Sequence, residues 1–214
     1  SKPVNFEVKK GEIVGVTGLD GNGQDDFVKI LAGVNESHGG TTEILDSNEN
    51  FLKYNSLEDA KNNGISFVSG DRKKEGILPN LSIYENLVVP LYKKTSKAGF
   101  LGFVNWMELN GIFDWEVERL SIKTGPRDNL IGSLSGGNQQ KVMIARSFAQ
   151  HPKVLILNDP ARGIDVSTKR DLYVHLRKYV EEGDTVVFLS SELEEFIGLC
   201  PKVMVFRNGT VFDI

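Results

Sequence analysis

Apolar and polar residues follow one another along the chain in blocks that predict strands separated by helices. Five short runs are almost entirely apolar: residues 13–16, 65–68, 154–157, 186–189 and 203–206. Strands buried on both faces of a parallel sheet have such runs, because neither face contacts water. Residues 27–32 and 167–182 have the spacing of helices that connect such strands. The sequence therefore predicts an α/β fold.

The middle of the chain has a different pattern. Residues 79–150 contain helical patterns and loops but no convincing buried strand. Ser82 and Glu85 have the spacing of a capping box, which starts a helix. After Ser135, several apolar residues fall on one helical stripe: Val142, Met143, Ala145, Phe148 and Ala149. We expect a core formed by residues 1–78 and 151–214, with residues 79–150 inserted as a helical subdomain.

Composition narrows the class of protein. The 214 residues are 40% hydrophobic and carry a formal net charge of −4, which suits a globular protein and disfavours nucleic acid as a partner. The single cysteine, Cys200, cannot form an internal disulfide and suits a reducing compartment. The three histidines lack the spacing of a zinc site. No stretch has the length of an apolar membrane span, so we expect a soluble cytoplasmic protein.

A glycine-rich segment follows the first apolar run and opens a helix. Its glycines have the spacing of a phosphate-binding loop, in which backbone N–H groups and the helix dipole converge on phosphate oxygens. The candidate phosphate-binding residues are Gly18, Gly21, Asn22, Gly23, Gln24, Asp25 and Asp26. The order G-x-G-x-x-G of dinucleotide-binding folds does not fit this segment.

A second motif decides the class. Residues 134–141, Leu-Ser-Gly-Gly-Asn-Gln-Gln-Lys, resemble the signature sequence of ABC-type ATPases, and their ending resembles the ATPase subunits of ribose, galactose and xylose importers. Ser135 can cap a helix whose positive end is exposed by two glycines, and such a helix start favours the binding of a phosphate group. The resemblance implies that ATP is contacted by Leu134, Ser135, Gly136, Gly137 and Gln139.

Four further segments have the spacing of that family. Residues 154–160 resemble the Walker B strand, residues 161–165 the D-loop, residues 190–193 the switch-histidine region and residues 69–73 the Q-loop region. The resemblance covers nearly the whole chain. It implies a P-loop NTPase (RecA-like) core with the helical subdomain inserted, and ATP with Mg²⁺ as cofactors. Such importers commonly fuse two nucleotide-binding domains, and this chain most resembles the second, C-terminal one.

Six positions depart from the family's pattern where its members contact metal, water or phosphate: Gln24, Asp25, Gly70, Asn158, Asp159 and Ser191. Gln24 replaces the lysine that reaches the phosphates, and Asp25 replaces the Ser/Thr that holds Mg²⁺. Asn158 is neutral where the family has the Walker B carboxylate. Asp159 is one methylene shorter than the catalytic Glu, and Ser191, which with Glu194 has the spacing of a capping box, replaces the switch histidine.

The departures predict that this domain's own site binds ATP and Mg²⁺ weakly or not at all and hydrolyses little ATP. Asp25 and Asn158 stand at the metal positions, and Asp159 and Ser191 at the catalytic positions. An alternative is an active ATPase with rearranged ligands, in which Asp25 and Asp159 hold Mg²⁺. No adenine-stacking aromatic precedes Val4, so we expect an excised domain that lacks this contact.

The intact signature predicts a role in a pair of domains. In the family, each nucleotide lies between one Walker loop and the opposite signature, so this domain can complete its partner's site. The expected partners are a second nucleotide-binding domain fused upstream, membrane permease subunits and, indirectly, a periplasmic or extracellular sugar-binding protein. The domain would lie at the inner face of the cell membrane. Residues 20–24 also resemble nucleoside importers, so the cargo stays open, and a soluble ABC protein outside transport is a further alternative.

Overall fold

The computed structural model describes residues 4–46, 48–92 and 104–214 of the chain. The chain forms two compact units, each assembled from separate stretches: the first from residues up to Val68, Pro152–Pro160 and Tyr173–Ile214, the second from Ser69–His151 and Ala161–Leu172. The expected subdomain boundaries differ from these units at residues 69–78, at His151 and at residues 161–172. The residues before Val4, which bear on the expected excised start, lie outside the described part of the chain.

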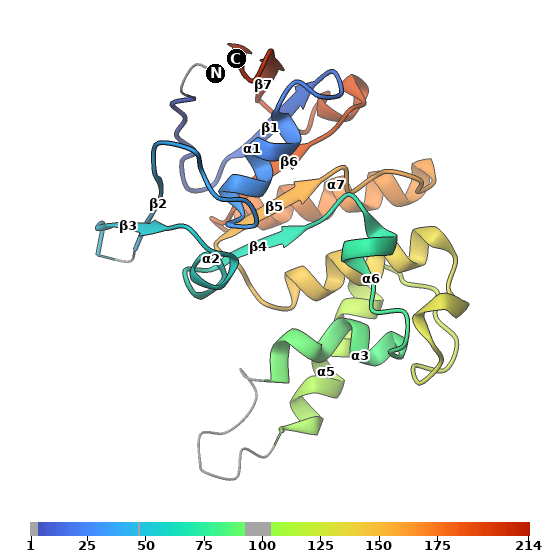
Figure 1. Cartoon of the computed structure of the whole chain (residues 1–214). Helices are drawn as coiled ribbons and strands as arrows, with labels where there is room; N and C mark the ends of the chain where they lie inside the picture. Colours follow the sequence, from blue (N-terminus) through green and yellow to red (C-terminus); the bar gives the residue numbers. More distant parts are fainter. Residues whose placement is uncertain (1–3, 47, 93–103) are drawn as a thin grey trace. The chain divides into compact units, whose positions relative to one another are not determined.

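A six-stranded sheet forms the centre of the first unit, in the order β4–β5–β6–β1–β7–β8 (Figure 1). Its strands are β1 (Ile13–Gly18), β4 (Ile65–Val68), β5 (Val154–Asn158), β6 (Thr185–Leu189), β7 (Lys202–Arg207) and β8 (Thr210–Asp213). All neighbouring strands are parallel except β8, which runs antiparallel to β7. Each of the five apolar runs lies in a parallel strand, so the sequence prediction is confirmed.

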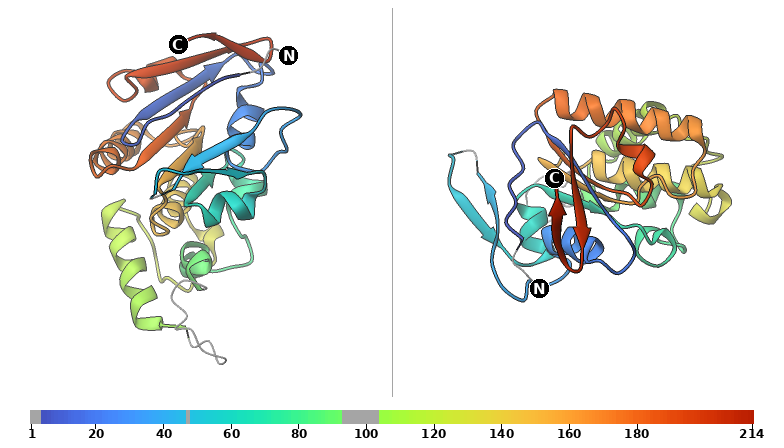
Figure 2. Two further views of the ribbon diagram at one scale, coloured as in Figure 1. Left: turned by 90° about the vertical axis from the view of Figure 1, so that its left-hand side faces the viewer. Right: turned by 90° about the horizontal axis from the view of Figure 1, so that it is seen from above.

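Helices cover both faces of this sheet. In Figure 2, α1 (Gln24–Leu31) and the later part of α7 (Val166–Glu181) lie on opposite sides of the strands. Val28 of α1 is fully buried in a core with Val14 and Val187 of the sheet. The first unit also contains α2 (Leu57–Asn62), a 3₁₀ turn η4 (Leu193–Phe196) and a separate hairpin of β2 (Thr42–Leu45) and β3 (Phe51–Tyr54).

The second unit is helical where the structure describes it. Its elements are a π-helical turn η1 (Arg72–Gly76), α3 (Ile83–Val88), η2 (Val89–Leu91), α5 (Trp106–Arg119), η3 (Ile131–Ser133), α6 (Gly136–Phe148) and the first residues of α7. The capping box predicted from Ser82 and Glu85 is present at the start of α3. Helices α3, α5 and α6 pack on one another through buried residues such as Leu87, Leu109 and Phe148.

Glu116 of α5 is a carboxyl group buried inside this helical unit. Only 1% of the residue is exposed, and burial raises its pKa to about 7, although Arg119 donates a hydrogen bond to Oε1 at 3.1 Å and opposes the shift. The other oxygen, Oε2, is buried without a hydrogen-bond partner among the described residues. The folded state therefore favours the protonated carboxyl group.

This burial predicts that stability falls as pH rises from about 4.5 to about 7. Between these values the folded chain binds a proton that the unfolded chain has released, so the free energy of unfolding decreases by at most about 3 kcal/mol. The measurement is urea unfolding of the chain at pH 5 and pH 8. Glu116→Gln should remove this loss, whereas Glu118→Gln, an exposed change on the same helix, should leave it in place. The same pH dependence in wild type and Glu116→Gln would contradict the prediction.

Candidate functional site

The loop between β1 and α1 has the backbone geometry of an anion-binding turn. Gly21 and Gly23 have positive φ values of 78° and 94°, which side chains other than glycine rarely adopt. Gly23 is the N-cap of α1, and no side chain caps the helix start. The first N–H groups of α1 therefore have no side-chain acceptor, and they suit phosphate oxygens.

Gln24 lies inside this loop and bonds the loop itself. Its Nε2 donates to the carbonyl oxygens of Gly18 and Leu19, both at 3.0 Å, and the residue is only 7% exposed. Its Oε1 is buried without a hydrogen-bond partner among the described residues. A neutral amide therefore occupies the start of α1, where a lysine would bring a positive charge to bound phosphate.

Asn22 fixes the outer part of the loop to the turn between β7 and β8. Its Nδ2 donates to the carbonyl of Leu19 at 2.9 Å, while its Oδ1 accepts from the N–H of Asn208 at 2.8 Å. The N–H of Gly209 donates to the Asn22 carbonyl at 3.0 Å. The sequence singled out Asn22 as a ligand contact but did not reveal this second anchor, which depends on a strand pairing distant in sequence.

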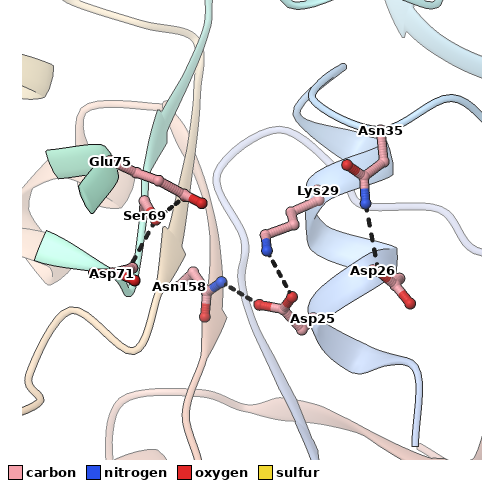
Figure 3. Close-up of polar contacts among 8 residues, drawn as sticks. All are labelled: Asp25, Asp26, Lys29, Asn35, Ser69, Asp71, Glu75 and Asn158. Atoms are coloured by element: carbon pink, nitrogen blue, oxygen red, sulfur yellow. Dashed lines mark hydrogen bonds and ion pairs between the residues drawn. The ribbon is translucent and has the colours of Figure 1, made fainter. Parts of the chain in front are cut away.

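Asp25 is held by two side chains (Figure 3). Its Oδ1 accepts a hydrogen bond from Nδ2 of Asn158 at 2.7 Å, and its Oδ2 pairs with Nζ of Lys29 at 2.9 Å. Burial alone would raise the pKa of Asp25, but the bonds from Lys29 and Asn158 and the Lys29 charge outweigh it, so the pKa lies below its usual value. Asp25 is therefore a carboxylate at neutral pH.

These residues do not fit a Mg²⁺ ion. Mg²⁺ requires near-octahedral oxygen ligands, yet both oxygens of Asp25 are engaged by nitrogen donors, and Asn158 turns its amide nitrogen toward Asp25. Within the described residues, no three acidic, histidine or cysteine side chains gather as a metal site. Asp26 bonds Asn35 instead, accepting from Nδ2 at 3.4 Å.

Asp159 and Ser191 meet at the ends of β5 and β6. Oδ1 of Asp159 accepts from the N–H of Ser191 at 3.1 Å, and the Asp159 backbone has a φ of 45°. The N–H of Asp159 donates to the carbonyl of Leu189 at 2.9 Å. One oxygen of the carboxylate thus already accepts a backbone bond within the fold.

The capping box predicted from Ser191 and Glu194 is wrong. The N-cap of η4 is Glu192, and no side chain caps it. The neighbouring Ser190 is used instead: its Oγ donates to Oε2 of the buried Glu195 at 2.7 Å and accepts from the N–H of Glu192 at 3.0 Å. The turn begins after Glu192, one residue later than a cap by Ser191 requires, so the spacing alone misplaced the start of η4.

The signature residues lie at the start of α6 in the second unit. Ser135 is the N-cap, and its Oγ accepts from the N–H of Asn138 at 3.4 Å. Gln139 ties the helix start to the preceding turn, because its Nε2 donates to the carbonyl of Leu134 at 3.0 Å. A Cβ on Gly137 would meet only Ile164 Cγ2, at 3.8 Å, so this part of the helix start is open.

The parallel sheet with a glycine-rich loop at β1, together with the helical unit that carries the signature, defines the class of ATP-binding cassettes. The ABC transporter family model matches residues 1–162, and the chain belongs to this family. The fold is also that of a solved dimeric ATP-binding cassette, MJ0796 bound to ADP and Pi, with a TM-score of 0.83 at 23% identity over 99% of this chain and 88% of that one. The predicted fold class is confirmed.

Curated relatives place the chain within the family. It is 40% identical over 216 residues to a ribose import ATP-binding protein, RbsA, of Bacillus cereus, covering 99% of this chain and 42% of that protein. It is 35% identical to the galactose/methyl galactoside import ATP-binding protein MglA of Mannheimia succiniciproducens, covering 99% of this chain and 41% of that protein. The chain thus spans about two fifths of the length of these relatives.

Proposed function

We propose that this chain is the second, C-terminal nucleotide-binding domain of an importer of a ribose-like sugar. The relatives that span more than twice its length are named for ribose and galactose import, which supports this cargo. The chain's own Walker site binds ATP weakly and hydrolyses little of it, and its signature completes the ATP site of a partner domain. The observation that carries the proposal is the contrast between the two motifs: Ser135 and Gly137 stand at an open helix start, whereas both oxygens of Asp25 are engaged by Lys29 and Asn158.

Three side chains of the Walker site explain why it would bind and hydrolyse ATP poorly. ATP, the cofactor of the family, would bring phosphate to the loop, but Gln24 offers no charge and its amide hydrogens already bond the loop. A charge-assisted hydrogen bond contributes roughly 1.5–3 kcal/mol, which is absent here. The Asp25 carboxylate adds repulsion toward phosphate. Asp159 is short and bonded to the backbone, so it cannot position water as a longer glutamate would.

The partners follow from the same proposal. A second nucleotide-binding domain supplies the Walker loop opposite the signature, and membrane permease subunits carry the cargo, which a periplasmic or extracellular binding protein delivers. Through the permease, the domain acts at the cytoplasmic face of the membrane. Among the residues that the structure describes, no helix is long and apolar enough to cross a membrane.

Uptake by vesicles that contain the complete transporter tests this function. The vesicles carry the full-length ATPase and its permease, with ATP on the side of the ATPase. The binding protein of the system and ribose, galactose or a nucleoside are on the other side. We expect ATP-dependent accumulation of ribose or galactose. Accumulation of the nucleoside alone would favour the nucleoside importer that the loop residues Asp20–Gln24 resemble. ATP-dependent uptake of none of them would contradict the proposal.

ATP binding by the isolated chain is expected to be weaker than micromolar and independent of Mg²⁺. Gln24 supplies no positive charge to phosphate, and both oxygens of Asp25 are already engaged by nitrogen donors, so a metal gains no free oxygen there. Calorimetric titration in Mg²⁺ and in EDTA should give the same dissociation constant within about twofold. Asp25→Asn removes one negative charge at constant shape and should tighten binding about tenfold, equivalent to ~1.4 kcal/mol. Micromolar binding that needs Mg²⁺ would support the alternative in which Asp25 and Asp159 hold the metal.

A further inference from the structure

We infer that Arg72 is a positioning residue for the signature, holding the first turn of α6 in the geometry that meets the partner's phosphate. Arg72 lies 64 residues before Gly136, and its Nη1 donates to the Gly136 carbonyl at 3.1 Å within the same unit. The inference rests on the proposed function, because the signature acts there on a nucleotide bound by another domain. The inference does not depend on Gln24 or Asn158, where this chain departs from the family's pattern.

Gly136 is shaped for this contact. A Cβ at this position would lie 3.0 Å from Nη2 of Arg72, closer than ordinary van der Waals contact, and 3.4 Å from its Cζ. The absent side chain therefore lets the guanidinium lie close against the helix start. The peptide between Gly136 and Gly137 is held by a bond from outside the helix, in addition to the helical ladder.

The turn that carries Arg72 is itself closed by hydrogen bonds (Figure 3). Ser69 Oγ donates to Oε2 of Glu75 at 2.5 Å and accepts from the N–H of Asp71 at 3.1 Å. Asp71 caps η1 by accepting from the N–H of Lys74 at 3.1 Å. The backbone of Arg72 is therefore fixed before its side chain reaches α6.

A second arginine fixes the other end of the same turn. Nη2 of Arg146 donates to the Gly76 carbonyl at 2.5 Å, and burial lowers the pKa of Arg146. A Cβ on Gly76 would meet Cε and Sδ of Met143, so in this structure the methionine side chain packs directly against the glycine between η1 and α6. Two points of α6, near its start and near its end, are thus tied to η1, and the bond from Arg72 is the one at the signature.

The surroundings of Arg72 do not favour the stability of the free domain. Its Nε is buried with no hydrogen-bond partner among the described residues, which costs stability. A guanidinium beside the positive end of a helix is also unfavourable in the free domain. The second cost is offset when an anion arrives at the helix start, because a fixed positive charge and preorganised N–H groups stabilise a phosphate during hydrolysis. This balance predicts a role in turnover rather than in folding.

The experiment measures ATP hydrolysis by the complete transporter with this domain carrying Arg72→Gln or Arg72→Lys. We expect Arg72→Gln to lower kcat at least tenfold while KM for ATP changes by less than about threefold, because ATP is held mainly by the partner's loop. Arg72→Lys restores a positive donor and should recover kcat to within about threefold of wild type. Lys74→Gln, an exposed charge change on the same turn, should leave kcat unchanged.

The melting temperature of each variant shows whether a loss of kcat comes from altered positioning of α6 or from a less stable fold. Arg72→Gln is expected to melt within about 2 °C of wild type, since the arginine makes one backbone bond and leaves Nε unpaired. A kcat within twofold of wild type in Arg72→Gln would overturn the inference. So would a loss of kcat that follows a lower melting temperature and that Arg72→Lys does not recover.

Gly137→Asp serves as the reference that separates the inference from the proposed function. If Gly137→Asp abolishes hydrolysis and Arg72→Gln does not, the inference fails and the proposed function stands. If Gly137→Asp also leaves hydrolysis intact, the proposed function fails and the inference fails with it.

Discussion

The isolated chain is expected to hydrolyse ATP at less than about 0.01 s⁻¹ in Mg²⁺, against the ~1–10³ s⁻¹ of typical enzymes. Phosphoryl transfer depends on positioning and charge stabilisation, and this chain lacks the groups that supply them. Gln24 is neutral and bonded to the loop, while Asn158 donates to Asp25 instead of supporting a metal. Asp159 accepts from the backbone of Ser191, which has no imidazole. Phosphate release under saturating ATP is the measurement.

Two variants sharpen this test. Gln24→Lys alone should do little, because Asn158 and Ser191 stay unsuited to the reaction. Asp159→Ala should leave the already negligible rate unchanged. Turnover near ~1 s⁻¹ in the wild-type chain that is lost in Asp159→Ala would overturn the expectation, and it would establish the alternative with rearranged ligands.

Replacing Gly137 by Asp should abolish ATP hydrolysis by the complete transporter, although the hydrolysed nucleotide is bound by the other domain. An aspartate at this open helix start places a negative charge and a side chain where the partner's γ-phosphate must lie. Ser135→Arg should have the same effect, because it removes the cap of α6 and fills the same space. The loss of one such donor costs about 10²–10³ in rate. The measurement is steady-state phosphate release by the reconstituted transporter.

The matched control for these variants is a change in the same helix at a residue that the resemblance does not place in contact with ATP. Lys141→Gln removes a charge one turn further along α6, where Lys141 Nζ donates to the carbonyl of Ser121 at 3.1 Å. We expect it to hydrolyse ATP at a rate within about threefold of wild type. Equal losses in Lys141→Gln and Gly137→Asp would mean that α6 is merely sensitive to substitution.

The parallel strands of the main sheet could be predicted because strands buried on both faces have continuous apolar runs in the sequence. The run at residues 154–157 is apolar throughout, and β5 is buried there except at Val154, at its start. The hairpin of β2 and β3 leaves no such mark, since Phe51, Leu52 and Lys53 are all exposed. Strand β8 lies at the sheet edge with one neighbour, and residues 212 and 213 are exposed. Patterns of burial therefore predicted the five parallel strands of the sheet, and they missed the antiparallel strand β8 and the separate hairpin.

The candidate site also contains residues that the sequence predicted and contacts that it did not. Motif spacing singled out Asp25, Asn158, Asp159 and Ser191, and the structure joins them in two hydrogen-bonded pairs. Lys29 was not singled out, although its spacing of four from Asp25 on a helix is a signal for an ion pair. The bond from the Arg72 side chain to α6 spans 64 residues and leaves no local pattern. Contacts of that kind depend on how the chain packs and are visible only in the folded chain.

The central claim is that this domain acts through its signature and not through its own Walker site. The measurement that tests it most directly compares ATP hydrolysis by the complete transporter carrying Gly137→Asp with that of the transporter carrying Asp159→Ala. Asp159 stands at the family's catalytic position but outside the machinery proposed here, so its replacement should leave the rate within about threefold, whereas Gly137→Asp should lower it by ~10² or more. A transporter that loses hydrolysis with Asp159→Ala and retains it with Gly137→Asp would contradict the account.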